Sequence, residues 1–157
     1  SASSVATSWW RAGASADPGS EQVHDLVERE VADAREHAEN DGGPYYGADW
    51  GFSVDPSTLI RCYIKDRTLY VTHEAYAVGA DNDTLPGLFG QVPGAFEYRI
   101  IGDSSRPETI HEMNKRGFHI WPSRKGAGSV EDGITHIRSY ERVVIHPRCR
   151  NTLVLYI

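Results

Sequence analysis

Two aspartates that lie far apart in the chain, Asp49 and Asp103, have the surroundings of metal-binding carboxylates. Asp49 lies in the run YYGADWGF, between aromatic and apolar residues, where we expect partial burial and hence a costly charge. Asp103 ends the run FEYRIIGD and precedes the turn SSRPE. Oxygen ligands without accompanying cysteines favour magnesium or manganese, and a divalent ion removes the repulsion between two adjacent acids. The two residues therefore predict a metal site, provided that the fold brings them together.

Each aspartate also has a local explanation that involves no metal. Asp49 could cap a turn through DWG, and Asp103 could cap the helix that we expect to begin at Arg106, because aspartate is common at both kinds of position. Spacing alone does not choose between capping and metal binding.

The elements that would position these acids follow from the pattern of apolar residues and turn signals after Pro44. Three successive strands with short turns predict an antiparallel meander, and helices then alternate with single strands, which predicts a mixed sheet flanked by helices. The expected strands are 45–52, 57–64, 68–76, 96–103, 118–122 and 142–147, and the expected helices are 81–92, capped by Asp81 or Asp83, 106–117, and a helix beginning near Ser129. In such a sheet, ligands gather at the carboxyl ends of the strands, where Asp103 would lie.

Length and composition favour one domain with its own core. The chain has 157 residues, of which 39% are hydrophobic. We expect a lead-in with an amphipathic helix, capped by Ser20, over residues 1–43, and the main domain over residues 44–157. No run approaches eighteen apolar residues and no secretory signal is evident, which argues against a membrane or export. Cys62 and Cys149 lie in strand-like apolar runs and are expected to be buried free thiols.

Charge is unevenly distributed along the chain, whose formal net charge is −6. Residues 1–100 carry 7 Lys and Arg against 16 Asp and Glu, whereas residues 101–157 carry 9 against 6. The second part could therefore present a surface to phosphates, although ordinary scatter of charge over a solvated face explains these counts equally well.

Three segments, taken together, resemble a known family. The segments YYGADWGFSVDPSTLIRCYI, IIGDSSRPETI and GFHIWPSRKGAGSVEDGITHIRSYERVVIHPRC are similar, in this order, to the C-terminal nuclease domain of the large terminase subunit of tailed bacteriophages, of the PBSX-like type. The resemblance covers residues 44 to 152. Residues 1–43 match nothing in that family.

This resemblance implies an α/β, RNase H-like fold and a metal-dependent endonuclease that cuts concatemeric double-stranded DNA during packaging. It assigns Asp49 and Asp103 to the two carboxylates that hold Mg2+ or Mn2+ in a two-metal site. In two-metal hydrolysis one ion activates the attacking water and the other stabilises the leaving oxygen. The resemblance further implies the terminase ATPase domain, the small terminase subunit and the portal protein as partners, and the host cytoplasm as location.

The chain departs from the family pattern in two respects. The family has a further acid in a later segment of the type NHAIDALRY, which this sequence lacks, so the nuclease domain is expected to be truncated or rearranged. Asp132 is the candidate substitute, although an acid near a helix start also simply favours the helix dipole. The sequence also lacks GxxxxGK[ST], so the ATPase motor is not in the chain.

Three basic residues, Arg106, Arg124 and Lys125, are candidate contacts for DNA phosphates. Lys125 lies on the Gly-rich segment SRKGAGS, where a cation and backbone amides could meet a phosphate. Arg106 could instead pair with the site acids or form a salt bridge at the helix start. The aromatic residues around the first strand are expected to be core rather than a platform for bases: Tyr45, Tyr46, Trp50 and Phe52.

Two other functions compete with the nuclease. One is a catalytically inactive terminase module that serves DNA docking or assembly of the packaging motor, suggested by the missing acid segment. The other is a different RNase H-like enzyme, such as a resolvase or a nuclease for RNA/DNA hybrids.

Overall fold

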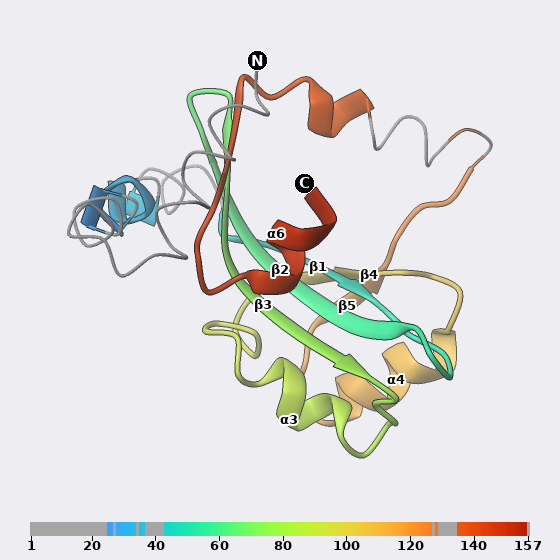
Figure 1. Ribbon diagram of the computed structural model, residues 1–157. Helices are drawn as coiled ribbons and strands as arrows, with labels where there is room; N and C mark the ends of the chain where they lie inside the picture. Colours follow the sequence, from blue (N-terminus) through green and yellow to red (C-terminus); the bar gives the residue numbers. More distant parts are fainter. Residues whose placement is uncertain are drawn as a thin grey trace. The chain divides into compact units, whose positions relative to one another are not determined.

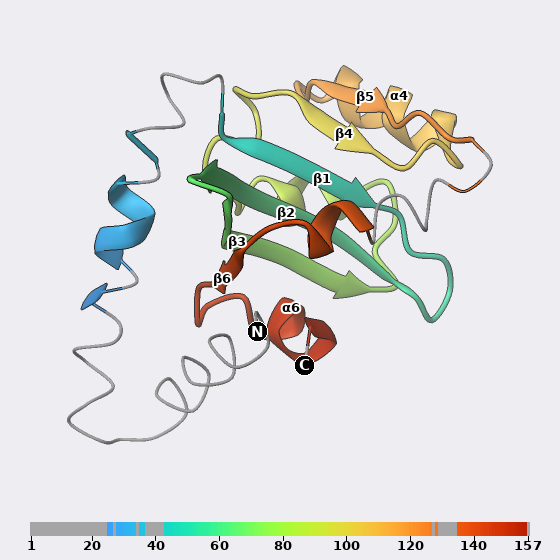
Figure 2. The same ribbon diagram turned by 90° about the horizontal axis from the view of Figure 1, so that it is seen from above.

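A computed structural model of the chain describes residues 25–26, 28–33, 35–36, 43–126, 128 and 135–156. Six strands form one sheet in the order β5-β4-β1-β2-β3-β6 (Figures 1 and 2). The strands are β1 Tyr45–Asp49, β2 Pro56–Lys65, β3 Thr68–Val78, β4 Ile100–Gly102, β5 Ile120–Pro122 and β6 Arg142–Ile145; the helices are α3 Leu85–Phe89, α4 Pro107–Lys115 and α6 Arg150–Tyr156.

The sheet mixes antiparallel and parallel neighbours, as the sequence predicts. Strands β1, β2 and β3 follow one another in the sheet as they do in the chain, whereas β4 pairs parallel with β1, β5 with β4, and β6 with β3. The long strand β2 shows why this segment is extended: every second side chain from Ser57 to Tyr63 is buried, which is the period of a strand with one covered face.

The chain forms two compact units, one of which comprises Tyr45–Arg61 and His73–Val130. Here α3 and α4 lie on the same face of the sheet (Figure 1). Phe89 of α3, Met113 of α4 and Ile100 of β4 are at most 1% exposed, so the two helices and the sheet enclose a shared core. Pro107 occupies the first turn of α4, and Gly117, with φ +99°, follows its end, in agreement with the predicted helix.

The other unit comprises Ser1–Pro44, Cys62–Thr72 and Glu131–Ile157. Its strands β3 and β6 pair from Thr68 with Arg142 to Val71 with Ile145, and its small core contains Tyr63, Tyr70 and Val144. The described residues of the N-terminal helix, 25–26, 28–33 and 35–36, belong to this unit, and Val31 packs against that core. No helix in the part of the chain that the structure describes is long and apolar enough to cross a membrane.

Two elements differ from the sequence-based expectation. Strand β4 is only three residues long, because the backbone N–H of Tyr98 bonds to the carbonyl of Gly94 in a turn and delays the strand. Cys149 does not lie in a strand-like run but directly precedes α6, which the sequence analysis did not predict. Both described cysteines are free, and burial raises the pKa of Cys62 to about 11.

The predicted cap of the short helix α3 is also corrected. The helix begins after Thr84, while Asp81 lies earlier and accepts hydrogen bonds from the backbone N–H groups of Asp83 and Thr84 at 3.0 and 2.9 Å. Asp81 therefore closes the turn before the helix instead of occupying the cap position. Ser20 and the predicted helix start near Ser129 lie outside the described residues.

Candidate functional site

The register between β1 and β4 makes Asp49 and Asp103 neighbours. Ala48 is the partner of Gly102 in the parallel ladder, and the backbone N–H of Asp103 donates to the carbonyl oxygen of Ala48 at 2.9 Å. Asp49 follows Ala48 on β1 and Asp103 follows Gly102 after β4, and adjacent strands lie about 4.8 Å apart. Two acids separated by more than fifty residues in sequence thus end adjacent strands at the same edge of the sheet.

The two aspartates also share a face of the sheet. Tyr46 and Ile100 are buried against the helices, whereas their successors Gly47 and Ile101 are exposed. Because side chains alternate along a strand, Asp49 and Asp103 both fall on the face opposite the core. Asp49 is exposed, so the prediction that its charge is partly buried is wrong. A cation would instead relieve the repulsion between the two neighbouring carboxylates.

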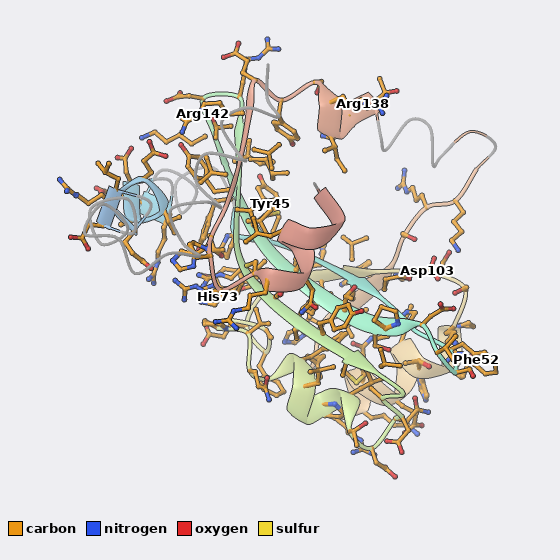
Figure 3. All side chains as sticks on the ribbon, viewed as in Figure 1. Tyr45, Phe52, His73, Asp103, Arg138 and Arg142 are labelled. Atoms are coloured by element: carbon orange, nitrogen blue, oxygen red, sulfur yellow. The ribbon has the colours of Figure 1, made fainter. Side chains whose placement is uncertain are left out.

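Asp103 is held in its ionised form by two neighbours. The ammonium of Lys125 lies 2.5 Å from Oδ1, and the hydroxyl and backbone N–H of Ser105 donate to Oδ2. The hydrogen bond from Lys125, followed by that from the Ser105 hydroxyl, holds the pKa of Asp103 below its ordinary value. Figure 3 shows Asp103 at the end of β4. The sequence analysis gave Lys125 as a candidate contact for a DNA phosphate and did not foresee its pairing with Asp103.

Trp50 connects the ends of the two strands. Its indole Nε1 donates to the carbonyl oxygen of Asp103 at 2.8 Å, and its backbone N–H bonds to Oδ1 of Asp49 at 3.0 Å. The ring is buried and stacks on Phe89, with 5.6 Å between centroids. Gly102 makes room for it, since a Cβ at this position would lie 3.0 Å from the Trp50 ring. Trp50 is core, as predicted, and in addition positions both aspartates.

The other aromatic residues divide into two groups. Tyr46 is buried, as predicted, but Tyr45 and Phe52 are 43% and 72% exposed, which contradicts their assignment to the core. Tyr45 alternates with Tyr46 and so faces away from the helices, and Phe52 projects from the loop after β1 (Figure 3). Alternation along the strand was the signal that could have separated Tyr45 from Tyr46.

The remaining predicted residues are partly gathered at this edge. The Arg106 guanidinium lies over the Phe52 ring, 5.1 Å from its centroid, and forms no ion pair with a carboxylate among the described residues. Arg124 is exposed beside Lys125. Asp132 lies outside the described residues, so its role stays a prediction.

The donor set fits one divalent ion more readily than two. Two carboxylates can hold a magnesium-like ion whose other positions are taken by water or substrate phosphate oxygens. Within the described ranges, no group of three or more His, Cys, Asp or Glu side chains is arranged to hold a metal ion. A two-metal site would therefore need at least one further ligand from outside those ranges.

Comparison with solved structures relates this arrangement to known proteins. The nuclease domain of g2p, the large terminase of bacteriophage SPP1, with bound Mn, matches with a TM-score of 0.62 and 26% identity over 69% of this chain and 63% of that domain. A large terminase from a thermophilic bacteriophage matches at 0.54 and 14% identity, over 72% of this chain and 30% of that protein. The large terminase nuclease of the thermophilic phage G20c, with bound magnesium, matches at 0.50 and 16% identity, over 70% and 60%.

These matches confirm the resemblance to large terminase nucleases and the RNase H-like fold. The chain spans less than two thirds of each of these three solved structures. Neither a scan against protein-family models nor a search of curated proteins finds a match.

Proposed function

We propose that this chain, which has the fold of the large terminase nuclease domains, is a metal-dependent endonuclease that cuts concatemeric double-stranded DNA during phage packaging. The observation that supports this proposal is the placement of Asp49 and Asp103, side by side and on one face, at the ends of β1 and β4. That is the edge of an α/β sheet at which ligands commonly bind.

Divalent metal is the cofactor that this pair best fits, and Mn and magnesium are bound in the SPP1 and G20c nucleases. Asp49 and Asp103 would hold Mg2+ or Mn2+, with Asp132 as a further proposed ligand for a second ion. When bound, such ions activate water and stabilise the leaving oxygen of a phosphodiester. Ser105 would keep Asp103 oriented and ionised for this task.

Lys125 pairs with Asp103, and its side chain is 52% exposed. We infer that this side chain would turn away on its flexible stem if a metal ion were bound by Asp103. We infer that Lys125 then contacts a DNA phosphate, together with Arg106 and Arg124. Such contacts position DNA without reading its sequence, so cleavage should show little sequence preference and should weaken as salt is raised.

The place of this activity in the cell belongs to the same proposal. The chain would act in the host cytoplasm alongside the terminase ATPase domain, the small subunit and the portal. The domain boundary that we propose, with a lead-in over residues 1–43 and the nuclease over residues 44–157, would leave the aspartate pair within the nuclease.

Plasmid cleavage in the presence of manganese tests the activity. We expect Asp49→Asn and Asp103→Asn each to reduce cleavage about a hundredfold or more, since even groups outside the first coordination shell contribute about 10- to 100-fold. Glu112→Gln is the matched control, because it also removes one carboxylate, from the surface pair with Lys115 on α4. Cleavage by Asp49→Asn at the rate of this control would refute the proposal.

A catalytically inactive docking or assembly module is the second candidate function. It is favoured by the absence of a three-acid cluster among the described residues. This candidate predicts that the intact chain binds linear DNA or a portal but never cleaves DNA with magnesium or manganese. Comparison of duplex DNA, RNA/DNA hybrids and four-way junctions as substrates would separate the packaging nuclease from other RNase H-like enzymes.

A further inference from the structure

A pocket of about 360 Å³ opens at the end of β1, on the face of the sheet that carries α3 and α4. Three segments line it: residues 50–53 with Ser57 after β1, residues 79–82 with Leu85 after β3, and Arg106 with Thr109 at the start of α4. The carboxyl ends of β1 and β3 both border it, which is where ligands bind in sheets of this type. Its volume lies within the range of small-molecule sites, about 300 to 1,000 Å³.

The cationic side of the pocket suits a phosphate next to a flat ring. Arg106 lies over Phe52 and forms no ion pair with any carboxylate that the structure describes, so its guanidinium remains available to an anion. A guanidinium binds phosphate through paired hydrogen bonds. Phe52 is 72% exposed, although an apolar ring of this size gains from being covered. A nucleobase stacks readily on such a ring.

An acidic residue in the lining of the pocket argues against a simple anion. Asp81 lines the pocket as well, and its carboxylate already accepts hydrogen bonds from the backbone N–H groups of Asp83 and Thr84. Asn82 adds an amide beside it. The negative charge of Asp81 repels a second phosphate, but its carboxylate can accept hydrogen bonds from the amino group of a base. A ligand with one phosphate and one base matches a lining that contains both Arg106 and Asp81.

Trp50 joins this pocket to the aspartates. Its ring lines the pocket, while its indole and backbone N–H groups bond to Asp103 and Asp49. We propose that the pocket binds one unpaired nucleotide of the DNA strand, with its phosphate on Arg106 and its base on Phe52, and that the strand passes from there around the end of β1 to the aspartate pair on the other face of the sheet. This inference rests on the proposed function, since it identifies a substrate subsite of the same nuclease.

Binding to a chain that cannot cut separates the pocket from catalysis. We would use Asp49→Asn, which keeps an acceptor for the Trp50 N–H, with EDTA present, and titrate dAMP and a fluorescent single-stranded 12-mer. Bound dAMP should shift the NMR signals of the Trp50 indole N–H and the Arg106 side chain. In this background, Arg106→Ala and Phe52→Ala should each weaken binding of the 12-mer about tenfold.

Matched variants make the result decisive. Arg138→Ala removes the same charge from an exposed residue outside the pocket and should leave dAMP binding unchanged. Phe52→Trp keeps an aromatic ring at this position and should therefore retain the affinity that Phe52→Ala loses. Equal effects of Arg106→Ala and Arg138→Ala would overturn the proposal, as would displacement of dAMP by an equal concentration of inorganic phosphate. Because no readout requires cleavage, failure of the pocket and failure of the nuclease are distinguishable.

Discussion

At the scale of single residues, the state of Asp103 depends on Lys125. The ammonium is the main cause of the lowered pKa of this carboxyl, and the Ser105 hydroxyl is the next. Because the folded-state pKa lies below that of the unfolded chain, ionised Asp103 stabilises the fold above about pH 3.9, and this contribution is lost as pH falls through the lowered value.

Replacing Lys125 by methionine should therefore raise the pKa of Asp103. We expect Lys125→Met to move the titration of the Asp103 carboxyl toward higher pH, because the main hydrogen bond to its ionised form is gone. Carbon-13 NMR of the carboxyl group measures this directly. Arg124→Met, which removes the neighbouring charge, is the control and should leave the titration in place. A pKa that does not rise in Lys125→Met would show that the ion pair does not form in solution.

The contact between Gly102 and Trp50 allows a second prediction at this scale. A Cβ on Gly102 would lie 2.9 Å from Cγ2 of Ile120 and 3.0 Å from the Trp50 ring, so Gly102→Ala should reduce the free energy of unfolding by about 1–3 kcal/mol. Urea denaturation followed by tryptophan fluorescence measures the change. Gly47→Ala, on the adjacent strand with nothing within 4 Å of the added Cβ, should cost less. Similar losses in both variants would contradict the proposed packing.

At the scale of elements, the hairpin between β2 and β3 has a strained turn. Asp66 and Arg67 have φ values of +49° and +60°, a left-handed conformation that favours asparagine, aspartate or glycine. Arg67 is the residue that fits it poorly, because other side chains cost about 1–2 kcal/mol in this conformation. The backbone of this turn is typical of the sequence Asn-Gly, and Arg67 stands where glycine would be favoured.

Arg67→Gly should stabilise the protein despite removing an exposed ion pair with Glu141. Relief of the left-handed strain is worth about 1 kcal/mol, whereas an exposed pair of this kind contributes less. The difference in unfolding free energy between Arg67→Gly and Arg67→Ala isolates the backbone effect, because both lose the guanidinium. An alanine variant as stable as the glycine variant would show that the turn is not strained.

At the scale of the whole molecule, charge pairs attach the N-terminal helix to its own unit. Asp33 pairs with Lys65, Glu30 with Arg142 at 3.2 Å, and Glu28 with Arg148 at 2.9 Å. The acids are 35% to 66% exposed, so salt screens these contacts. Val31 is the apolar part of the same contact.

Salt should therefore expose this helix before it affects the sheet. Trypsin should cut after Arg29 and Arg35 faster at about 1 M than at about 0.1 M NaCl, because the Debye length falls from about 10 to 3 Å. Cleavage sites can be identified by mass spectrometry, with rates corrected by a short peptide digested at each salt concentration. Corrected rates that are independent of salt would mean that the ion pairs do not hold the helix.

Local patterns in the sequence determined the elements and the candidate acids. Alternating burial along β2, and Pro107 and Gly117 around α4, are properties of neighbouring residues, so the sequence alone predicts them. Asp49 and Asp103 were likewise identified from their residue types and positions after apolar runs. The metal-binding role of these two residues stays a prediction.

Tertiary structure decided which of those residues meet. The parallel register of β1 with β4 places Asp49 beside Asp103, and the loop after β5 brings Lys125 to the same carboxylate. Exposure of Phe52 depends on which loops surround it. Such contacts join residues that are distant along the chain, and no periodicity within a short window records them, because strand order and register are set by the packing of the complete sheet.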